Sequence, residues 1–157
     1  MHLTLLTVGK TDIPWVREGL EMYSSRLKHY VPFEVREIPE LKGVSALSRE
    51  QIKEKEGELI LRQVKPGDEV FLLDEHGREY RSLEFAEWLG RRLTLSGRDL
   101  VFVIGGAYGF SGAVYARADG KLSLSKMTYS HQLVRTIFAE QLYRAFTILR
   151  GEPYHPE

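Results

Sequence analysis

The sequence contains no cysteine among its 157 residues. Disulfides, thiol nucleophiles and thiolate metal sites are therefore excluded, and cysteine usage does not indicate a redox compartment. No apolar run is long enough for a membrane span, and charged residues follow the short apolar start MHLTLLTVGK almost at once. The start of the chain predicts neither a signal peptide nor a transmembrane helix, so we expect a cytoplasmic protein with no membrane partner and no metal.

The chain also lacks an excess of charge of either sign, because 22 Lys and Arg residues balance 22 Asp and Glu residues. This balance argues against a protein that binds nucleic acid through bulk electrostatics. Basic residues are denser in the middle of the chain, at Arg78, Arg81, Arg91, Arg92 and Arg98. Ordinary surface solubility is the simpler interpretation of these residues. If RNA is the substrate, local basic clusters or shape must provide the recognition.

The common phosphate-binding motifs are missing as well. The glycine-rich stretch 105–112, GGAYGFSG, has neither the spacing of a P-loop nor that of GxGxxG, so a nucleotide phosphate site is not predicted there. It follows the continuous apolar run 100–104, which is typical of a strand covered on both faces. Ligands of open α/β sheets bind at the carboxyl ends of strands, where this loop lies. The glycines indicate either a loop that touches a ligand or only a tight turn.

What is present is a regular alternation of predicted strands and helices. The predicted strands are 3–8, 33–38, 70–74, 100–104 and 122–125, the second of them near a sheet edge and the third ending at Asp74 before a turn at 75–77. The predicted N-caps of the long helices are Asp12, Ser48 (in a capping box with Gln51), Ser82, and Thr128 or Ser130. A short helix follows the glycine loop. This order predicts an α/β fold: one mostly parallel sheet with helices on both faces, in a single domain spanning residues 1–157.

The last predicted helix carries an apolar stripe at helical spacing and is stopped by Gly151 and Pro153. Arg135, Glu140 and Arg144 avoid this stripe. Taken by themselves, they indicate a solvated helix face.

Several motifs follow one another in the second half: IGGxxGFS, then LSLSKMTxSHxLVR, then EQLYRAxxI, then PYHxE. With TLLTVGK near the start and LLDEHG in the middle, the chain resembles the SPOUT class of RNA methyltransferases over its whole length. Within that class it is similar to the RlmH family, which methylates N3 of a pseudouridine in bacterial 23S ribosomal RNA. The resemblance implies a C-terminal deep trefoil knot, a homodimer whose partner subunit helps to close each cofactor pocket, S-adenosyl-L-methionine as cofactor, and ribosomal RNA within the assembled ribosome as substrate.

The resemblance also assigns cofactor contacts to three segments. The matching positions are Leu73, Asp74, Gly105, Gly106, Ser125, Lys126, Met127, Thr128, Tyr129 and Ser130. Three loops that meet at one sheet edge can recognise adenine through backbone groups. In many relatives the glycine loop reads GGPEG, whereas Ala107 and Tyr108 stand here. No catalytic carboxylate is therefore assigned to this loop, and Tyr108 either stacks on a base or packs within the loop.

Methylation at N3 of a pseudouridine requires loss of the N3 proton, so the site needs a base or donors that stabilise the developing oxyanion. The candidates are His131, Arg135, Arg144, Tyr154 and His155. The PYH match to the family favours Tyr154 and His155 as substrate-facing residues. Our hypothesis is that His155 is the base and Arg144 the oxyanion stabiliser, whereas His131 supports the start of the last helix.

Two other functions fit the same sequence. One is a SPOUT methyltransferase that acts on a ribose 2′-hydroxyl of tRNA. The other is a non-catalytic ribosome-binding module, for which the altered glycine loop is the sequence hint. Cofactor titration separates the module from the enzymes, and mapping of the methylated nucleotide separates the two enzymes.

Overall fold

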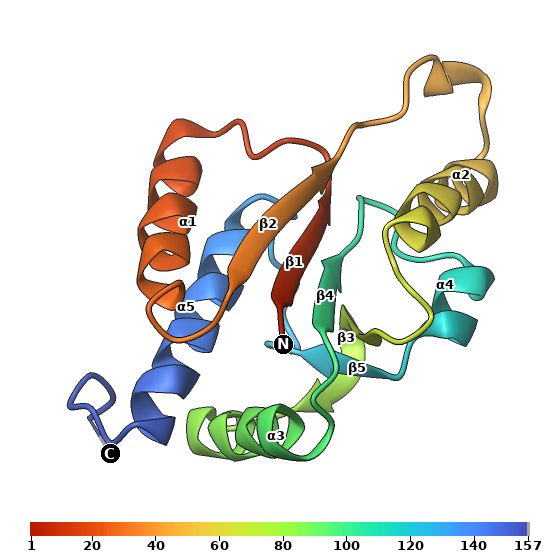
Figure 1. Cartoon of the computed structure of the whole chain (residues 1–157). Coiled ribbons are helices and arrows are strands. Elements are labelled where there is room, and N and C mark those ends of the chain that lie inside the picture. Colours follow the sequence, from red (N-terminus) through yellow and green to blue (C-terminus); the bar gives the residue numbers. More distant parts are fainter. Residues whose placement is uncertain (157) are drawn as a thin grey trace.

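The computed structural model describes residues 1–156 and contains one sheet of five strands in the order β2-β1-β4-β3-β5 (Figure 1). The strands are β1 (Leu3–Val8), β2 (Phe33–Ile38), β3 (Glu69–Glu79), β4 (Leu100–Ile104) and β5 (Gly120–Ser123). All neighbouring pairs are parallel. The predicted parallel sheet is therefore confirmed, and the strands end at a common edge.

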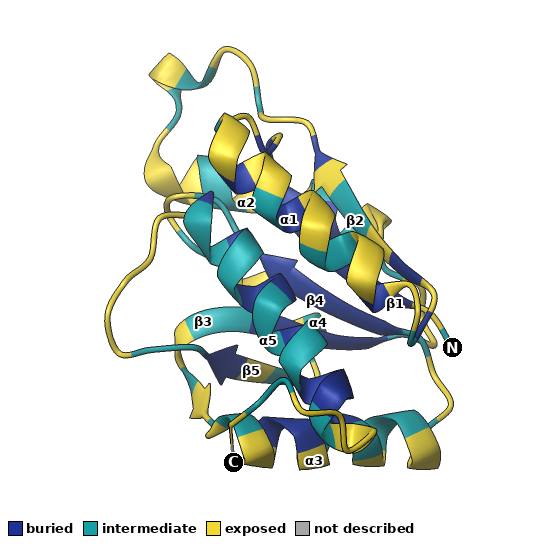
Figure 2. Ribbon diagram, turned by 90° about the vertical axis from the view of Figure 1, so that its left-hand side faces the viewer, coloured by how far each residue is buried: buried dark blue, intermediate teal, exposed yellow. Residues whose placement is uncertain are grey.

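Helices cover both faces of the sheet, as predicted. They are α1 (Pro14–Leu27), α2 (Arg49–Arg62), α3 (Ser82–Leu95), α4 (Gly112–Arg117) and α5 (Leu133–Leu149), with a short 3₁₀ turn at Val44–Ala46. One core packs α1, α3 and α5 against the sheet, and a second core packs α2 and α4 against the other face. Figure 2 shows this arrangement for α1, whose exposed residues face outward, whereas the residues of α5 in this view are mostly intermediate or buried.

Burial along the strands follows their position in the sheet. Every residue of the central strands β1 and β4 is buried, because helices cover both faces of them. Along β2, which has only β1 as a neighbour, Phe33 and Ile38 are buried while Glu34 and Glu37 are exposed. The prediction of a strand near an edge is thus confirmed.

The predicted end of the third strand is wrong. β3 continues through the expected turn at 75–77 to Glu79, and its pairing with β5 shifts register between Leu73 and Arg78. Such a shift is typical of a β-bulge. Gly77 lies so close to β5 that a Cβ atom there would be 2.5 Å from the backbone nitrogen of Leu122. Tertiary pairing with β5 therefore keeps this polar segment in the strand, and Asp74 lies within β3 rather than at its end.

The start of two helices differs from prediction by one residue. The N-cap of α1 is Ile13 rather than Asp12, and that of α3 is Arg81 rather than Ser82. The Arg81 N–H donates to the Glu84 carboxylate at 2.8 Å, which replaces the expected side-chain cap.

The two remaining predicted caps belong to α2 and α5. The capping box of α2 is confirmed, because the Gln51 N–H donates to Ser48 Oγ at 3.1 Å and the Ser48 N–H donates to Gln51 Oε1 at 2.8 Å. The N-cap of α5 is Gln132, which makes no side-chain cap hydrogen bond, so the prediction of Thr128 or Ser130 is wrong. Ser130 Oγ nevertheless accepts the N–H of Leu133, the first residue of α5, at 3.1 Å. Thr128 does not cap the helix, since its hydroxyl donates to Glu75. β5 begins two residues earlier than predicted, at Gly120.

Candidate active site

A pocket of about 570 Å³ opens at the carboxyl edge of the sheet. It is surrounded by residues 73–76 of β3, the loop 104–110 after β4, and the segment from the end of β5 to the start of α5. A volume of this size is typical of small-molecule and cofactor sites. Nine of the ten predicted cofactor positions line it, namely Leu73, Asp74, Gly105, Gly106, Ser125, Met127, Thr128, Tyr129 and Ser130, and Lys126 does not. The fold therefore brings together residues that are up to 57 positions apart, since 130 − 73 = 57.

Two glycines of the glycine loop lie close to other parts of the protein. A Cβ atom on Gly105 would lie 2.9 Å from the Phe110 ring, and one on Gly106 would lie 2.7 Å from the carboxylate of Glu56. The buried Phe110 ring leaves little room for a side chain at position 105, whereas the end of the Glu56 side chain can turn away from position 106. The loop thus runs close against α2 and its own anchor Phe110, with the pocket beside it.

Glu56 on α2 is a residue that the sequence analysis missed. It brings a carboxylate to the glycine loop, although the loop itself contains no acid. Burial, with a smaller contribution from the charge of Glu40, raises the pKa of the Glu56 carboxyl above its usual range. No sequence signal distinguishes Glu56 from the other acids of α2, because only the packing of α2 against the loop brings it there.

Polar contacts connect the segments around the pocket. The Tyr115 hydroxyl donates to the Asp74 carboxylate, and the Thr128 hydroxyl donates to Glu75 at 2.8 Å. Burial, together with the hydrogen bond to Asp74, raises the pKa of Tyr115 to about 12. Tyr115 is therefore a neutral donor at physiological pH, and Asp74 is the carboxylate on the pocket wall.

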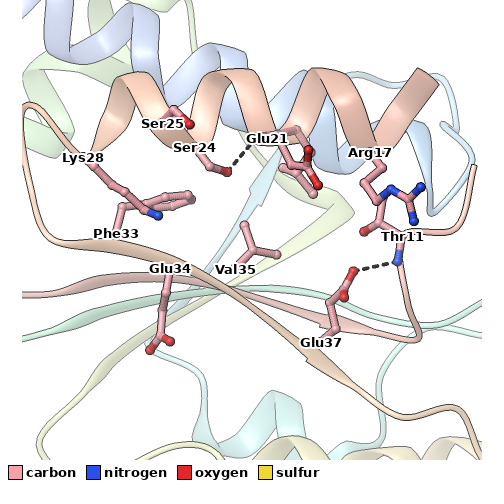
Figure 3. Close-up of a pocket in the computed structure, with 11 residues that line it drawn as sticks. Thr11, Arg17, Glu21, Ser24, Ser25, Lys28, Phe33, Glu34, Val35 and Glu37 are labelled. Carbon is pink, nitrogen blue, oxygen red and sulfur yellow. Dashed lines mark hydrogen bonds between the residues drawn. The ribbon is translucent and has the colours of Figure 1, made fainter. Parts of the chain in front are cut away.

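Arg135 corrects the prediction of a solvated helix face. Its side chain is fully buried and donates to the carbonyls of Val8 at 2.8 Å, Gly9 at 2.9 Å and His131 at 2.9 Å. Burial lowers the pKa of the guanidinium, and the nearby Glu37 carboxylate, 3.6 Å away, opposes this shift. Glu37 also accepts the Thr11 N–H at 2.6 Å (Figure 3). Arg135 thus fastens the start of α5 to the end of β1 and is not exposed to a substrate.

Gln132, close to Arg135, also fastens the start of α5 to the loop after β1. Gln132 donates through its amide to the Lys10 carbonyl at 2.8 Å and accepts the Asp12 N–H at 3.2 Å. His131 lines the pocket, and its backbone carbonyl accepts from Arg135. The wall formed by residues 128–134 is therefore held by the loop after β1.

Arg144, Tyr154 and His155 form a cluster of their own. Arg144 Nη2 contacts the Glu140 carboxylate at 2.6 Å, and its Nη1 contacts His155 Nδ1 at 2.9 Å. The guanidinium carbon lies 4.9 Å from the centre of the Tyr154 ring. Burial, followed by a hydrogen bond with Tyr23, raises the pKa of Tyr154 to about 12, so its hydroxyl stays protonated.

The contact with Arg144 decides the proton arrangement of His155. A guanidinium can only donate, so Nδ1 accepts this hydrogen bond and the neutral ring carries its proton on Nε2. In this arrangement the Nδ1 lone pair is directed at Arg144. Proton acceptance at Nδ1 therefore requires that the contact with Arg144 first be released.

The cluster does not reach the pocket of its own chain. None of Arg144, Tyr154 and His155 lines the pocket. Figure 1 shows the described residues that follow α5 beside the lower end of that helix, whereas the loop after β4 leaves the sheet near its upper end. The predicted catalytic residues and the predicted cofactor residues are thus brought together as two groups, but not with each other.

A second cleft of about 370 Å³ lies between α1 and β2 (Figure 3). Its charged residues carry both signs, with Arg17 and Lys28 beside Glu21, Glu34 and Glu37. None of the predicted site residues lines this cleft. Among residues 1–156, no group of three or more metal-ligating side chains is present, and no helix is long and apolar enough to cross a membrane.

The family of predicted SPOUT methyltransferases matches residues 1–155 of the chain. The chain belongs to the SPOUT methyltransferase family. The α/β fold expected for a SPOUT enzyme and the assignment as an RNA methyltransferase are confirmed by the parallel sheet, by this match and by the full-length relatives described next. The family also implies a methyl donor.

Relatives of this SPOUT chain share its full length. It is 53% identical over 157 residues to ribosomal RNA large subunit methyltransferase H of Parabacteroides distasonis, and the match covers 100% of both chains. It is 54% identical to the protein of the same name in Phocaeicola vulgatus, again over 100% of both chains. A solved structure described as giving insights into the 2-OH methylation of C/U34 on tRNA aligns with 96% of this chain and 98% of its own, at 17% identity and a TM-score of 0.47.

Proposed function

We propose that this protein transfers a methyl group from S-adenosyl-L-methionine to N3 of a pseudouridine in 23S ribosomal RNA. The observation that carries the proposal is the pocket at the carboxyl edge of the sheet, where nine predicted cofactor positions meet. Full-length relatives named ribosomal RNA large subunit methyltransferase H support the choice of RNA. We further propose that residues 1–157 act as one methyltransferase domain.

The residues around the pocket fit this cofactor. Leu73, Ile104 and Leu124 provide an apolar wall suited to an adenine ring. The backbone groups of segment 125–130 are close enough to the pocket to read the edge of the ring. Asp74 provides a carboxylate, which suits a ligand with a sulfonium and an ammonium group. When bound, the cofactor supplies a methyl group already activated by positive charge.

The nucleophile is N3 of the pseudouridine, and the protein has to position this atom and remove its proton. Transfer of the methyl group is a displacement in which positioning supplies much of the rate. We propose that the C-terminal cluster removes the N3 proton. His155 accepts this proton at Nδ1 once its contact with Arg144 is released, and Arg144 then stabilises the negative charge on the pseudouridine oxygen next to N3. Tyr154, neutral because its pKa is about 12, faces the substrate beside Arg144, whose guanidinium lies over its ring.

A homodimer is part of the proposal. Within one chain the cluster lies away from the pocket, so a second copy has to bring its tail to the first copy's pocket. The neutral net charge supports recognition of rRNA within the assembled ribosome in the cytoplasm, because the chain has no positive excess that would hold free RNA.

The decisive experiment is methyl transfer from labelled S-adenosyl-L-methionine to whole ribosomes, free 23S RNA and tRNA, each taken from cells that lack the endogenous enzyme. We expect label on ribosomes, at N3 of a pseudouridine. Label on tRNA alone would show that the protein is a tRNA methyltransferase instead. Binding of the cofactor without label on any RNA would favour a non-catalytic ribosome-binding module.

A further inference from the structure

Exposed apolar side chains gather around the pocket. Nine large hydrophobic residues are exposed among residues 1–156, and four of them line it, namely Tyr108, Tyr115, Met127 and Tyr129. Single exposed apolar residues are ordinary on a protein surface, but a group of them around a pocket marks a binding surface. Three of the four are aromatic, which suits a ligand with flat rings.

Tyr108 stands at the tip of a well-defined turn. The Gly109 N–H donates to the Gly106 carbonyl at 3.2 Å, so Ala107 and Tyr108 are the two corner residues. Gly109 has a φ of 84°, which only glycine adopts readily. Phe110 follows and is buried in the core of α2 and α4. The turn is thus anchored, while the Tyr108 side chain remains 44% exposed.

Arg49 gives the Tyr108 ring a fixed charged neighbour. Its guanidinium carbon lies 5.1 Å from the centre of the ring, within the range of a cation–π contact. Arg49 is the first residue of α2 and lies between Ser48 and Gln51, the two members of the capping box, so the helix start fixes its backbone. The partial positive charge of the helix N-terminus adds to that of the side chain.

A second pair of the same kind lies on the pocket rim. The Lys121 ammonium is 5.5 Å from the centre of the Tyr115 ring, whose hydroxyl is held by Asp74. Aromatic rings interleaved with basic side chains bind unpaired nucleotides, because bases stack on the rings and phosphates pair with the cations. Arg49 and Lys121 thus place two positive charges beside the rings of Tyr108 and Tyr115, although the pocket wall itself carries the acids Asp74 and Glu75.

We propose that Tyr108 and Arg49 form a stacking platform for an unpaired base of the substrate RNA at the mouth of the pocket. The inference rests on the proposed function and adds to it a site that binds RNA independently of the cofactor. A place at the exposed tip favours RNA over the cofactor as the occupant, since the apolar wall suited to adenine is formed by Leu73, Ile104 and Leu124. The platform would stack on any base, because every base has a flat face.

The test uses steady-state methylation of ribosomes that lack the methyl group, at saturating cofactor, with cofactor affinity measured separately by calorimetry. We expect Tyr108→Ala to raise KM for ribosomes about tenfold or more, with the cofactor Kd within about twofold of wild type. Tyr108→Phe keeps the ring and recovers most of this loss. Arg49→Gln raises KM about two- to fivefold, because the charge and the cation–π contact disappear.

Leu95→Ala is the matched control, since Leu95 is 81% exposed at the end of α3 and does not line the pocket. It should keep the wild-type KM. If Tyr108→Ala keeps the wild-type KM while the wild type methylates ribosomes, the result contradicts the stacking platform but leaves the proposed function intact. If the cofactor Kd weakens by the same factor as KM, the ring belongs to the cofactor site, and the platform is again wrong. Absence of methylation by the wild type overturns both proposals.

Discussion

At the scale of single residues, the buried guanidinium of Arg135 has the largest structural consequence. Its donors satisfy three backbone carbonyls from β1, the loop after it and the start of α5, together with the Thr11 hydroxyl at 2.8 Å. Hydrogen bonds from a charged group are about twice as strong as neutral ones. An apolar replacement would leave these buried acceptors without a partner.

We therefore expect Arg135→Met to destabilise the protein by about 3–5 kcal/mol, the usual cost of breaking a buried charged contact. Arg135→Lys should recover part of this, because a lysine keeps the charge but cannot reach all the carbonyls. Urea denaturation measures both. Arg91→Gln, which removes an exposed i,i+4 contact with Glu87, is the control and should cost less than about 0.5 kcal/mol. Equal stability of Arg135→Met and the control would contradict the anchoring role.

Burial of the Tyr115 phenol, followed by its hydrogen bond to Asp74, predicts a raised pKa for this tyrosine. The pKa of Tyr115 is raised from 10.0 to about 12, so the folded state favours the neutral phenol. The stability gained in this way is present below pH 10 and is lost as pH rises from 10 toward 12. We expect Asp74→Asn to move the Tyr115 transition back toward 10, as followed by tyrosinate absorbance, with Tyr115→Phe identifying the transition. An unchanged titration would show that the carboxylate does not hold this phenol.

At the scale of elements, β3 shows how pairing overrides local sequence. Residues 75–77 have the composition of a turn, yet β5 holds them in the strand across a bulge. Gly77 makes this possible because nothing larger fits against the backbone of β5. The same bulge presents Asp74 and Glu75 to the pocket.

Two glycines provide a graded test of this packing. A Cβ atom on Gly77 would meet the backbone of β5 at 2.5 Å, whereas one on Gly106 would meet the movable end of Glu56 at 2.7 Å. We expect Gly77→Ala to cost about 2 kcal/mol or more and Gly106→Ala clearly less, since a side chain can turn away and a strand cannot. Gly67→Ala, with open space around it, is the control. Thermal unfolding compares the three variants, and the reverse order of stability would refute the steric argument.

At the scale of the whole molecule, the separation of pocket and C-terminal cluster predicts an active site shared between two copies. Thr128→Trp fills the pocket, and His155→Ala removes the proposed base. Each variant alone should be inactive. A mixture refolded together at equal amounts should regain about a quarter of wild-type activity, because half of the dimers are mixed and each mixed dimer has one intact site.

The outcome of this mixing experiment separates the two arrangements. Recovery occurs only when the tail of one copy serves the pocket of the other. If each chain used its own tail, no dimer in the mixture would contain an intact site, and the mixture would stay inactive. Cofactor binding by His155→Ala, measured by calorimetry, confirms that this variant retains its pocket.

The sequence by itself determined the elements and their class. Apolar runs and helical stripes are local patterns, so the five strands, the long helices and the capping box at Ser48 were predictable from neighbouring residues. The motifs identified the family. The elements and the family could be predicted because they depend on residue type and local spacing, which do not require knowledge of the tertiary structure.

Only the tertiary structure decided how distant residues meet. Arg135 looked like a surface residue until α5 packed against the end of β1 and enclosed it. The packing of α2 places Glu56 next to the glycine loop, and it also places Arg49 over the Tyr108 ring. Burial, contact and hydrogen bonding between remote segments follow from packing, and packing depends on the whole chain at once.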